Sequence, residues 1–417
     1  MLQRIQMRSN LLHKSGSMNK RISIFGYGTT TKPLTKHIKN AVFYDDNCKE
    51  PYGGIEGSFV RPSSEFKPEH SDLEITSPGI PPSNPLIQKA RNLISEYDFF
   101  KDVQNFKIWI SGTNGKTTTT QMMQHLLEDK GSLSGGNIGV PLALLEQDAP
   151  IWILETSSFT LHYTQKAAPN IYVLLPLSPD HLSWHGDMEA YIKDKLKPLS
   201  MMRSIDTVII PQEYQNTPTR AKCITYTDEE DLATKFELDT QKVKFEGAFL
   251  MDALLAMAVD KIMYQRVNYT KINSFELDPH RQEEFFDAHN RLWVNDTKAT
   301  NLDATIAAVE RYKKHHICLI LGGDDKGVDL SELFEFLQEK DLHIYTIGSN
   351  KAKLSALAQS YHIPYTMCKD LANAVITIDL HLKKDGVALL SPAAASLDEF
   401  SSYAQRGDQF KQSVAKL

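Results

Sequence analysis

The chain has 417 residues, 41% of them hydrophobic and 24% charged, which is the composition of a soluble globular protein with two or three domains. Its formal net charge of −6 argues against a nucleic-acid partner, which would require a basic face. No apolar run approaches the ~20 residues that span a membrane, so no membrane partner is expected. The cysteines lie far apart without a CxxC pair, so we expect a reduced, cytoplasmic protein with neither a zinc site nor a disulfide framework; they are Cys48, Cys223, Cys318 and Cys368.

The first 17 residues are basic in character but lack the apolar core of a signal peptide. Met18-Asn19-Lys20 directly precedes the first predicted strand. We therefore expect residues 1–17 to be an extra N-terminal segment and Met18 to be the natural start.

A strand–helix–strand pattern follows, with strands over 21–25 and 41–44 and a helical stretch over 33–39. A further strand begins at 73 and runs into the loop SPGIPPSNP, whose prolines exclude a helix before Asn84. This order of elements is typical of an α/β domain.

The turn after the first strand, GYGTTT over 26–31, half-matches a dinucleotide-binding fingerprint, with Asp45 about twenty residues further on. Thr31 replaces the third glycine of that fingerprint, which allows close packing of helix on strand. Two interpretations stay open. A nucleotide diphosphate binds at Gly28 and Thr29 with Asp45 or Asp46 near its sugar or base, or the turn binds no ligand.

The most informative stretch of the chain is SGTNGKTT, residues 111–118, between an apolar strand over 108–110 and an amphipathic helix. Backbone N–H groups of such a turn converge on an anion at the helix N-terminus. The motif predicts that Lys116 reaches the outer phosphates of a nucleoside triphosphate and that the Thr117 hydroxyl ligates Mg²⁺. A plain polar turn is the alternative, since Ile110 stands where the strict motif has glycine or alanine.

Apolar runs over 151–155, 171–177 and 207–211 predict a buried parallel sheet beside this loop. Glu155 ends one run and is predicted to hold Mg²⁺, or alternatively to cap a helix. His181 follows another run and is predicted to bind a second metal or substrate, or alternatively to be solvated.

Lys195 lies in a predicted helix over 188–198, where periodicity does not distinguish it from Lys193 or Lys197. A protonated lysine is a poor metal ligand. Lys195 would bind Mg²⁺ only as a carbamate formed with CO₂.

An amphipathic helix over 249–263 is predicted to close this central domain. After His280 we expect a third set of elements, with a helix over 301–312 and strands over 291–296, 317–323, 343–348 and 386–393. Boundaries near 94 and 278 divide the chain into three α/β domains: 1–94, 95–278 and 279–417.

Three loops of this last domain carry charged and hydroxyl side chains at predicted strand ends. They are NDTKATN (295–301), GGDDKG (322–327) and SPAAASLD (391–398). Each alone could be a solvated loop. Together they predict a pocket for a small dicarboxylate, with lysines facing its carboxylates.

Taken together, these motifs make the chain resemble the Mur ligase family over nearly its whole length from about Lys20. The resemblance rests on the order and spacing of SPGIP (77–81), GTNGKTTTT (112–120), GGNIGVPL (135–142), LETSSF (154–159), SPDHLSWH (178–185), NDTKATN (295–301), LGGDDKG (321–327) and SPAAASLDEFSSYAQRGDQF (391–410). It implies a Rossmann-like N-terminal domain for UDP, a central P-loop ATPase domain with a parallel sheet, and a Rossmann-like C-terminal domain for an amino acid.

The implied reaction is ATP-dependent formation of an amide bond in peptidoglycan synthesis, through an acyl phosphate. The implied substrates are UDP-N-acetylmuramoyl-L-alanine, D-glutamate and ATP, the implied cofactors are two Mg²⁺ ions and CO₂ as the Lys195 carbamate, and the implied state is a monomer. The DNPR and DGAHNP signatures of relatives that use other substrates are absent, which favours D-glutamate.

The resemblance also assigns residues to each ligand. ATP would be bound by Gly112, Thr113, Asn114, Gly115, Lys116, Thr117, Thr118, Arg281, Asp296 and Lys298, and metal by Thr117, Glu155, His181 and Lys195, with Lys116, His181 and Lys195 catalytic. The UDP substrate would meet Gly28, Thr29, Asp45, Asp46, Gly79, Asn137, Ser157 and His181. D-glutamate would meet Thr300, Lys326, Ser396, Leu397 and Tyr403.

The chain departs from the family where a His-Asn pair usually precedes an NALAA-like helix, since it has EGAFLMDALLAMA over 246–258. The asparagine that would approach adenine is replaced at Phe249 or Asp252, so the adenine contacts are not predicted. Tyr403 stands where phenylalanine is frequent. Two rival functions stay open: an amino-acid ligase of the family with another substrate, such as a folylpolyglutamate synthase, and a P-loop nucleotide switch without ligation.

Overall fold

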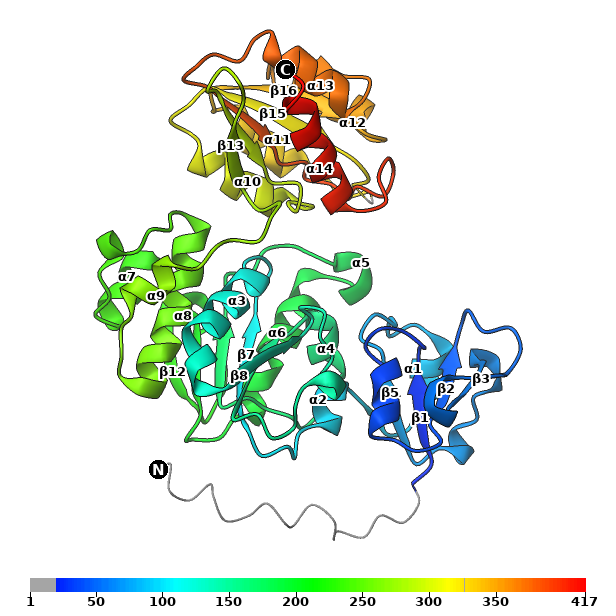
Figure 1. Cartoon of the computed structure of the whole chain (residues 1–417). Coiled ribbons are helices and arrows are strands. Elements are labelled where there is room, and N and C mark those ends of the chain that lie inside the picture. The colour runs from blue at the N-terminus through cyan, green and yellow to red at the C-terminus, as the bar shows by residue number, and fades with distance from the viewer. Residues whose placement is uncertain (1–19, 326) are drawn as a thin grey trace.

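The computed structural model describes residues 20–325 and 327–417, so the predictions about residues 1–17 and Lys326 lie outside the described residues. In the described chain, three six-stranded sheets form three α/β units (Figure 1). The central unit lies between the N-terminal unit on one side and the C-terminal unit on another. The predicted fold class is confirmed.

The N-terminal unit has a sheet of strand order β3-β4-β2-β1-β5-β6, parallel except for the pair β3 and β4. Its elements are β1 (Ile22–Phe25), β2 (Val42–Asp45), β3 (Tyr52–Gly53), β4 (Phe59–Pro62), β5 (Leu73–Thr76), α1 (Pro85–Lys89) and β6 (Leu93–Ile94). The helix predicted over 33–39 is a shorter 3-10 helix, Lys32–Lys36. The helix ends at Lys36, and the positive φ of 54° at Asn40 is incompatible with a helix that continues toward β2.

The central sheet is entirely parallel, in the order β12-β11-β10-β7-β9-β8. Its strands are β7 (Phe106–Ser111), β8 (Ser132–Gly136), β9 (Ile151–Glu155), β10 (Ile171–Leu174), β11 (Thr207–Pro211) and β12 (Lys222–Tyr226). Its helices are α2 (Glu96–Phe99), α3 (Lys116–Leu127), α4 (Ser158–Tyr163), α5 (Leu182–His185), α6 (Met188–Met201), α7 (Glu229–Lys235), α8 (Ala248–Tyr264) and α9 (Tyr269–Asn273).

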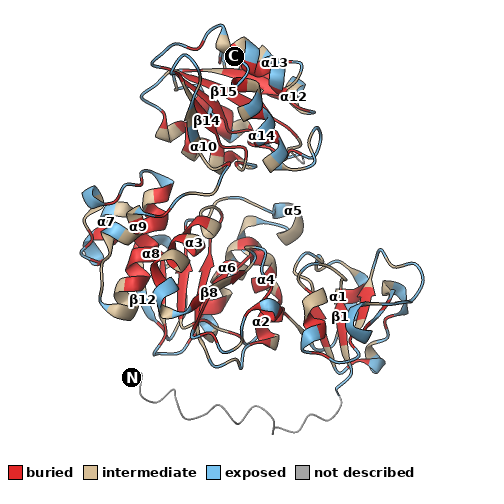
Figure 2. Cartoon of the chain, viewed as in Figure 1, coloured by how far each residue is buried: buried red, intermediate tan, exposed pale blue. Residues whose placement is uncertain are grey.

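Helix α8 differs from the amphipathic helix predicted for it, because nearly every residue over 249–260 is buried. It packs against α3 and α7, and its apolar side chains belong to the same core as those of α3 and the sheet. A helix enclosed by neighbours on most sides is apolar around most of its circumference. Figure 2 shows it as an almost continuously buried segment.

The C-terminal sheet has the order β13-β14-β18-β15-β16-β17, with only β13 antiparallel. Its strands are β13 (Glu283–Phe286), β14 (Leu292–Asn295), β15 (Ile317–Gly322), β16 (Leu342–Ile347), β17 (Tyr365–Met367) and β18 (Val387–Leu390). Its helices are α10 (Leu302–Arg311), α11 (Ser331–Leu337), α12 (Lys351–Ser360), α13 (Leu371–Asp379) and α14 (Tyr403–Val414).

The three units are joined differently. One hydrophobic cluster contains side chains of both the N-terminal and the central unit, for example Ile24, Phe43 and Trp152. The two clusters of the C-terminal unit contain only residues from 285 onward among those described. The first two units therefore share apolar packing, whereas the C-terminal unit has cores of its own. Among the described residues, no helix is both long and apolar enough to cross a membrane.

Candidate active site

The loop of residues 111–115 begins where β7 ends, at the carboxyl edge of the central sheet, and leads directly into α3. Because β7 lies between β9 and β10, the ends of those strands flank this loop. Gly112 and Gly115 have φ values of 147° and 80°. A Cβ atom on Gly112 would lie 2.5 Å from Leu175 Cβ, and one on Gly115 2.4 Å from Asp252 Oδ1, so both positions require glycine.

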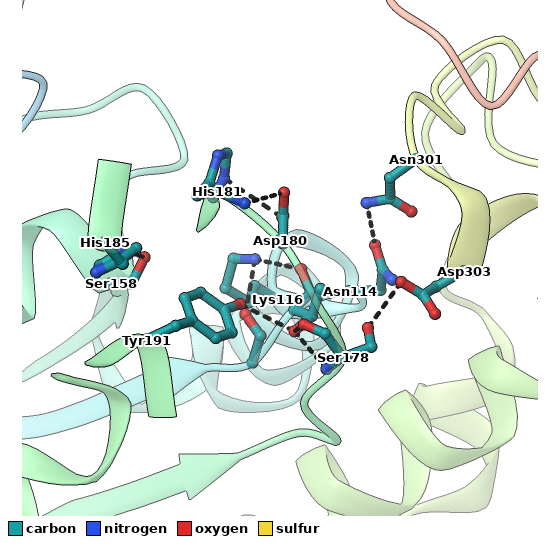
Figure 3. A network of polar contacts seen from close by, with 12 residues as sticks. Asn114, Lys116, Ser158, Ser178, Asp180, His181, His185, Tyr191, Asn301 and Asp303 are labelled. Carbon is teal, nitrogen blue, oxygen red and sulfur yellow. Dashed lines mark hydrogen bonds and ion pairs between the residues drawn. The ribbon is translucent and has the colours of Figure 1, made fainter. Parts of the chain in front are cut away.

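Lys116 and Thr117 begin α3 and point into the loop and the sheet edge (Figure 3 shows Lys116). Lys116 Nζ donates to the carbonyl oxygens of Gly112 and Thr113, at 2.9 and 2.6 Å. The Thr117 hydroxyl donates to Glu155 Oε2 at 2.8 Å, and the Asn137 amide donates to Oε1 of the same carboxylate at 2.8 Å. Glu155 is therefore not a helix cap; Ser157 caps α4 instead, accepting from Thr160 N.

The oxygens of Thr117 and Glu155 fit a hard cation such as Mg²⁺, which prefers hydroxyl and carboxylate ligands. Within the described residues, no three His, Cys, Asp or Glu side chains converge to hold a metal. Thr118 has a different environment from Thr117, since its hydroxyl is buried and finds no hydrogen-bond partner in the described part of the chain.

Lys195 is distinguished from its neighbours on α6 by burial. It is 1% exposed, whereas Lys193 is exposed and Lys197 donates to the His162 carbonyl. Lys195 Nζ donates to Gly112 O at 2.6 Å and to Ser111 Oγ at 3.2 Å, directly under the loop. Burial, reinforced by the nearby Lys116 cation, lowers the pKa of Lys195 well below its ordinary value.

His181 lies in the loop before α5, with a positive φ of 53° and a side chain that is half exposed. Its Nε2 is 3.3 Å from Asp180 Oδ2, and its ring lies against Phe159. Burial lowers the pKa of His181, the Asp180 carboxylate opposes this shift, and the Lys116 cation adds a smaller lowering effect.

The predicted nucleotide turn of the N-terminal unit is closed by its own side chains. Thr31 Oγ1 donates to Gly26 O and accepts from Gly28 N, and Asp45 accepts from Tyr27 N at 2.6 Å. Asp46 accepts from Asn84 Nδ2. Thr29 and Gly79 are exposed.

A small cavity lies between this unit and the central one, beside their shared apolar packing. Its lining includes Thr30, Thr76 and Pro78 from the N-terminal unit and Asn137, Thr160 and Tyr163 from the central unit. Residues at the strand ends of the N-terminal unit and Asn137 therefore line the same cavity, and Asn137 also contacts Glu155.

The residues expected to face ATP from the C-terminal side lie at the junction with the central unit. Lys298 Nζ is 3.9 Å from Asp278 Oδ2 and lies over the Tyr403 ring. Asp296 is 5% exposed and accepts from Ser391 Oγ and Gln282 N; burial raises its pKa to about 7. The Arg281 guanidinium lowers the pKa of both Asp296 and Lys298, and its buried Nε has no hydrogen-bond partner among the described residues.

The positions expected to receive the amino acid lie in the loops at the carboxyl edge of the C-terminal sheet. Thr300, Leu397 and Tyr403 are exposed, and Ser396 is buried. Sequence reasoning overlooked Arg406, although it lies within a motif that carries the family resemblance. Arg406 is 1% exposed and ties all three predicted loops together.

Arg406 donates to carbonyl oxygens of each loop. Its partners are Thr297 Oγ1 (2.8 Å), Thr297 O (3.0 Å), Ala394 O (3.1 Å), Gly322 O (3.3 Å) and Ala395 O (3.4 Å). A trans peptide places C=O and N–H on opposite sides, so an Ala395 carbonyl turned toward Arg406 turns the Ser396 N–H away from it. Burial lowers the pKa of Arg406 to about 10, so the group stays cationic at neutral pH.

Phe249 and Asp252, where the family asparagine is replaced, are both buried. Asp252 accepts from the Thr119 hydroxyl at 2.9 Å, and it lies directly behind Gly115. Asp252 therefore contacts the back of the phosphate-binding loop.

The chain is similar to known proteins in both sequence and fold. Residues 110–259 match the family profile described as Mur ligase middle domain. A UDP-N-acetylmuramoylalanine–D-glutamate ligase from Campylobacter jejuni (strain 81116) is 51% identical over 95% of this chain and 100% of its own length. The protein of that name from Helicobacter pylori (strain 26695) is 42% identical over the same shares.

A solved structure of a MurF ligase from Thermotoga maritima in complex with ADP has the same fold. It superposes with a TM-score of 0.58 at 15% identity, covering 94% of this chain and 97% of that one. The identities of 51% and 42% over 95% of the chain, together with the matched central domain, show the family: the chain belongs to the Mur ligases, among the UDP-N-acetylmuramoylalanine–D-glutamate ligases.

Proposed function

We propose that this protein ligates D-glutamate to UDP-N-acetylmuramoyl-L-alanine with ATP, in the cytoplasm, as a step of peptidoglycan synthesis. The products are UDP-N-acetylmuramoyl-L-alanyl-D-glutamate, ADP and phosphate. The observation that supports this most is the arrangement of Lys116, Lys195 and the Thr117–Glu155 pair around one loop. The full-length relatives bear the name of this activity.

The first step would convert an unreactive carboxylate into an acyl phosphate. The terminal alanyl carboxylate attacks the γ-phosphorus of ATP, a P–O bond forms, and ADP leaves. Carboxylate and triphosphate repel each other, and the Lys116 ammonium would offset that repulsion once ATP displaces the carbonyls of Gly112 and Thr113. Lys116 would thereby hold the phosphates in line with the attacking oxygen.

Two Mg²⁺ ions would neutralise charge on the phosphates. Thr117 and Glu155 would hold one, and His181 with Lys195 the other. Lys195 can serve only after its neutral amine adds to CO₂, which forms an N–C bond and releases one proton. The lowered pKa of Lys195 favours the neutral amine that this addition needs.

In the second step the deprotonated amine of D-glutamate attacks the acyl carbon, and phosphate leaves. Thr300, Lys326, Ser396, Leu397 and Tyr403 would orient D-glutamate. Arg281, Asp296 and Lys298 would lie on the C-terminal side of ATP. Gly28, Thr29, Asp45, Asp46, Gly79, Asn137 and Ser157 would bind the UDP substrate. The corresponding domains would be 1–94, 95–278 and 279–417.

Phosphate release from ATP tests the proposal directly. Purified protein is assayed with UDP-N-acetylmuramoyl-L-alanine and either D-glutamate or L-glutamate, with each substrate omitted in turn. Release that requires the acceptor and D-glutamate is the expected result. Release that ignores both would instead indicate a nucleotide switch.

A further inference from the structure

Beside the phosphate-binding loop, two polar side-chain pairs connect the central and C-terminal units (Figure 3). The Ser178 hydroxyl donates to Asp303 Oδ2 at 2.8 Å, and Asn301 Nδ2 donates to Asn114 Oδ1 at 3.2 Å. Asn114 and Ser178 belong to the central unit, and Asn301 and Asp303 begin α10 of the C-terminal unit. We call these four residues the bridge.

The bridge reaches the phosphate-binding loop through Thr113. Thr113 Oγ1 accepts from Ser178 N at 3.0 Å and lies 2.9 Å from the Tyr191 hydroxyl of α6. Thr113 also offers its carbonyl to Lys116 Nζ. Ser178 is therefore connected to the loop by hydrogen bonds that do not depend on Asp303.

The bridge reaches the predicted amino-acid loops through the start of α10. Asn301 caps this helix, its Oδ1 accepting from Ala304 N, and it directly follows Thr300. Thr305, one turn on, donates to Ser391 O, so α10 is attached to the strand end before Ser396. A displacement of α10 would move these loops with it.

We propose that Ser178 and Asp303 are positioning residues that set the C-terminal unit over the phosphate-binding loop for attack by the amino acid. This rests on the proposed function. Within residues 20–325 and 327–417, no hydrophobic cluster contains side chains of both the C-terminal and the central unit, so polar contacts such as the bridge contribute to its placement. Attack by an amine held on one unit upon a carbonyl held on the other depends steeply on that placement.

Hydroxylamine separates the two steps of the reaction, because it is small and captures an acyl phosphate without occupying an amino-acid site. We would measure acyl hydroxamate formed without D-glutamate, and amide formed with D-glutamate, for the wild type, Ser178→Ala, Asp303→Ala and the double variant. Asp341→Ala is the control, because it removes an exposed acid of the C-terminal unit that directly precedes β16 and pairs with His316.

Each single variant should lower kcat/KM for D-glutamate about three- to ten-fold, the range expected for one hydrogen bond, while hydroxamate formation stays near wild type. The double variant should lose no more than the worse single one, since both changes break the same contact. The control should behave like wild type in both assays.

Unchanged amide formation, additive losses in the double variant, or equal losses of amide and hydroxamate would each overturn the positioning role. The wild-type protein distinguishes failure of the proposed function from failure of the positioning role. If it makes no amide with D-glutamate, the proposed function itself is refuted, and the positioning role with it.

Discussion

Among single residues, Lys195 differs from the other lysines of α6 in its environment, because its side chain is buried. Its amine is enclosed beneath the phosphate-binding loop, where a cation is poorly solvated, whereas Lys193 on the same helix faces solvent. Burial and the nearby Lys116 cation both lower the pKa of Lys195 and so favour the neutral amine, which is the form that adds to CO₂.

Lys195→Ala should therefore abolish ligation, and added short-chain carboxylic acids should partly restore it by supplying the missing oxygens. Phosphate release at increasing acid concentration measures the rescue. Lys193→Ala is the matched control and should keep wild-type activity. Full activity of Lys195→Ala without any acid would exclude a carbamate ligand.

Arg406 lies in the C-terminal unit as a buried cation that donates to uncharged oxygens of three loops. Arg406→Lys keeps the charge but cannot reach three loops at once, because an ammonium lacks the planar fork of a guanidinium. We expect KM for D-glutamate to rise about tenfold or more, and KM for ATP to change much less.

Arg291→Lys provides the comparison, since Arg291 is also buried in the C-terminal unit but pairs with Asp287 and Asp379. Arg291 directly precedes β14, at the end of that strand opposite to the predicted pocket. It should reduce thermal stability without a selective effect on D-glutamate. Equal rises in both Michaelis constants for Arg406→Lys would argue against a role in arranging the amino-acid loops.

At the level of elements, α8 and α3 share an apolar core, and one buried carboxyl group, Asp252, also lies between them. Desolvation raises the pKa of Asp252 from its ordinary 3.8 to about 7, while the Thr119 hydroxyl bond opposes the rise. The folded protein thus keeps a proton that the unfolded chain releases at lower pH. The stability contributed by this proton is complete below about pH 4 and is lost as the pH rises through 7.

Asp252→Asn should remove this dependence. Between pH 5 and pH 8, the wild-type free energy of unfolding should fall by about 2 kcal/mol relative to that of the variant. Urea unfolding at several pH values gives both curves. Parallel curves would mean that Asp252 is ionised in the folded protein across this range.

The strands and helices that were predicted share a strong local signal. β9 and β11 match their predicted limits because continuous apolar, β-branched runs mark buried parallel strands. β8 and β17 were not predicted, since they lie at sheet edges and contain serine, glycine or threonine where a buried strand would be apolar. The prediction that α8 is amphipathic was wrong, because neighbouring elements bury nearly all of its residues and leave no polar face.

At the scale of the whole molecule, the N-terminal and central units share a hydrophobic cluster, whereas the C-terminal unit joins them through polar contacts and the segment between α9 and β13. Polar contacts between units exchange readily with water, so the C-terminal unit is the one expected to move when ligands bind.

Small-angle X-ray scattering should therefore show a smaller radius of gyration when a non-hydrolysable ATP analogue, the UDP acceptor and D-glutamate are added together. Lys116→Ala should remain at the value of the free protein, because its loop no longer holds the triphosphate. An unchanged radius in the wild type would count against closure of the C-terminal unit.

The α/β class, the phosphate-binding loop and the family could be predicted from the amino-acid sequence, because glycine spacing, apolar runs and motif order are local properties of the chain. Full-length relatives agree with that assignment. Four features became visible only in the folded chain: which lysine of α6 is buried, that Arg406 joins three loops, that Asp252 lies behind Gly115, and that Ser178 contacts Asp303. Each of these depends on desolvation or on contact between residues far apart in the chain, and no local pattern encodes either.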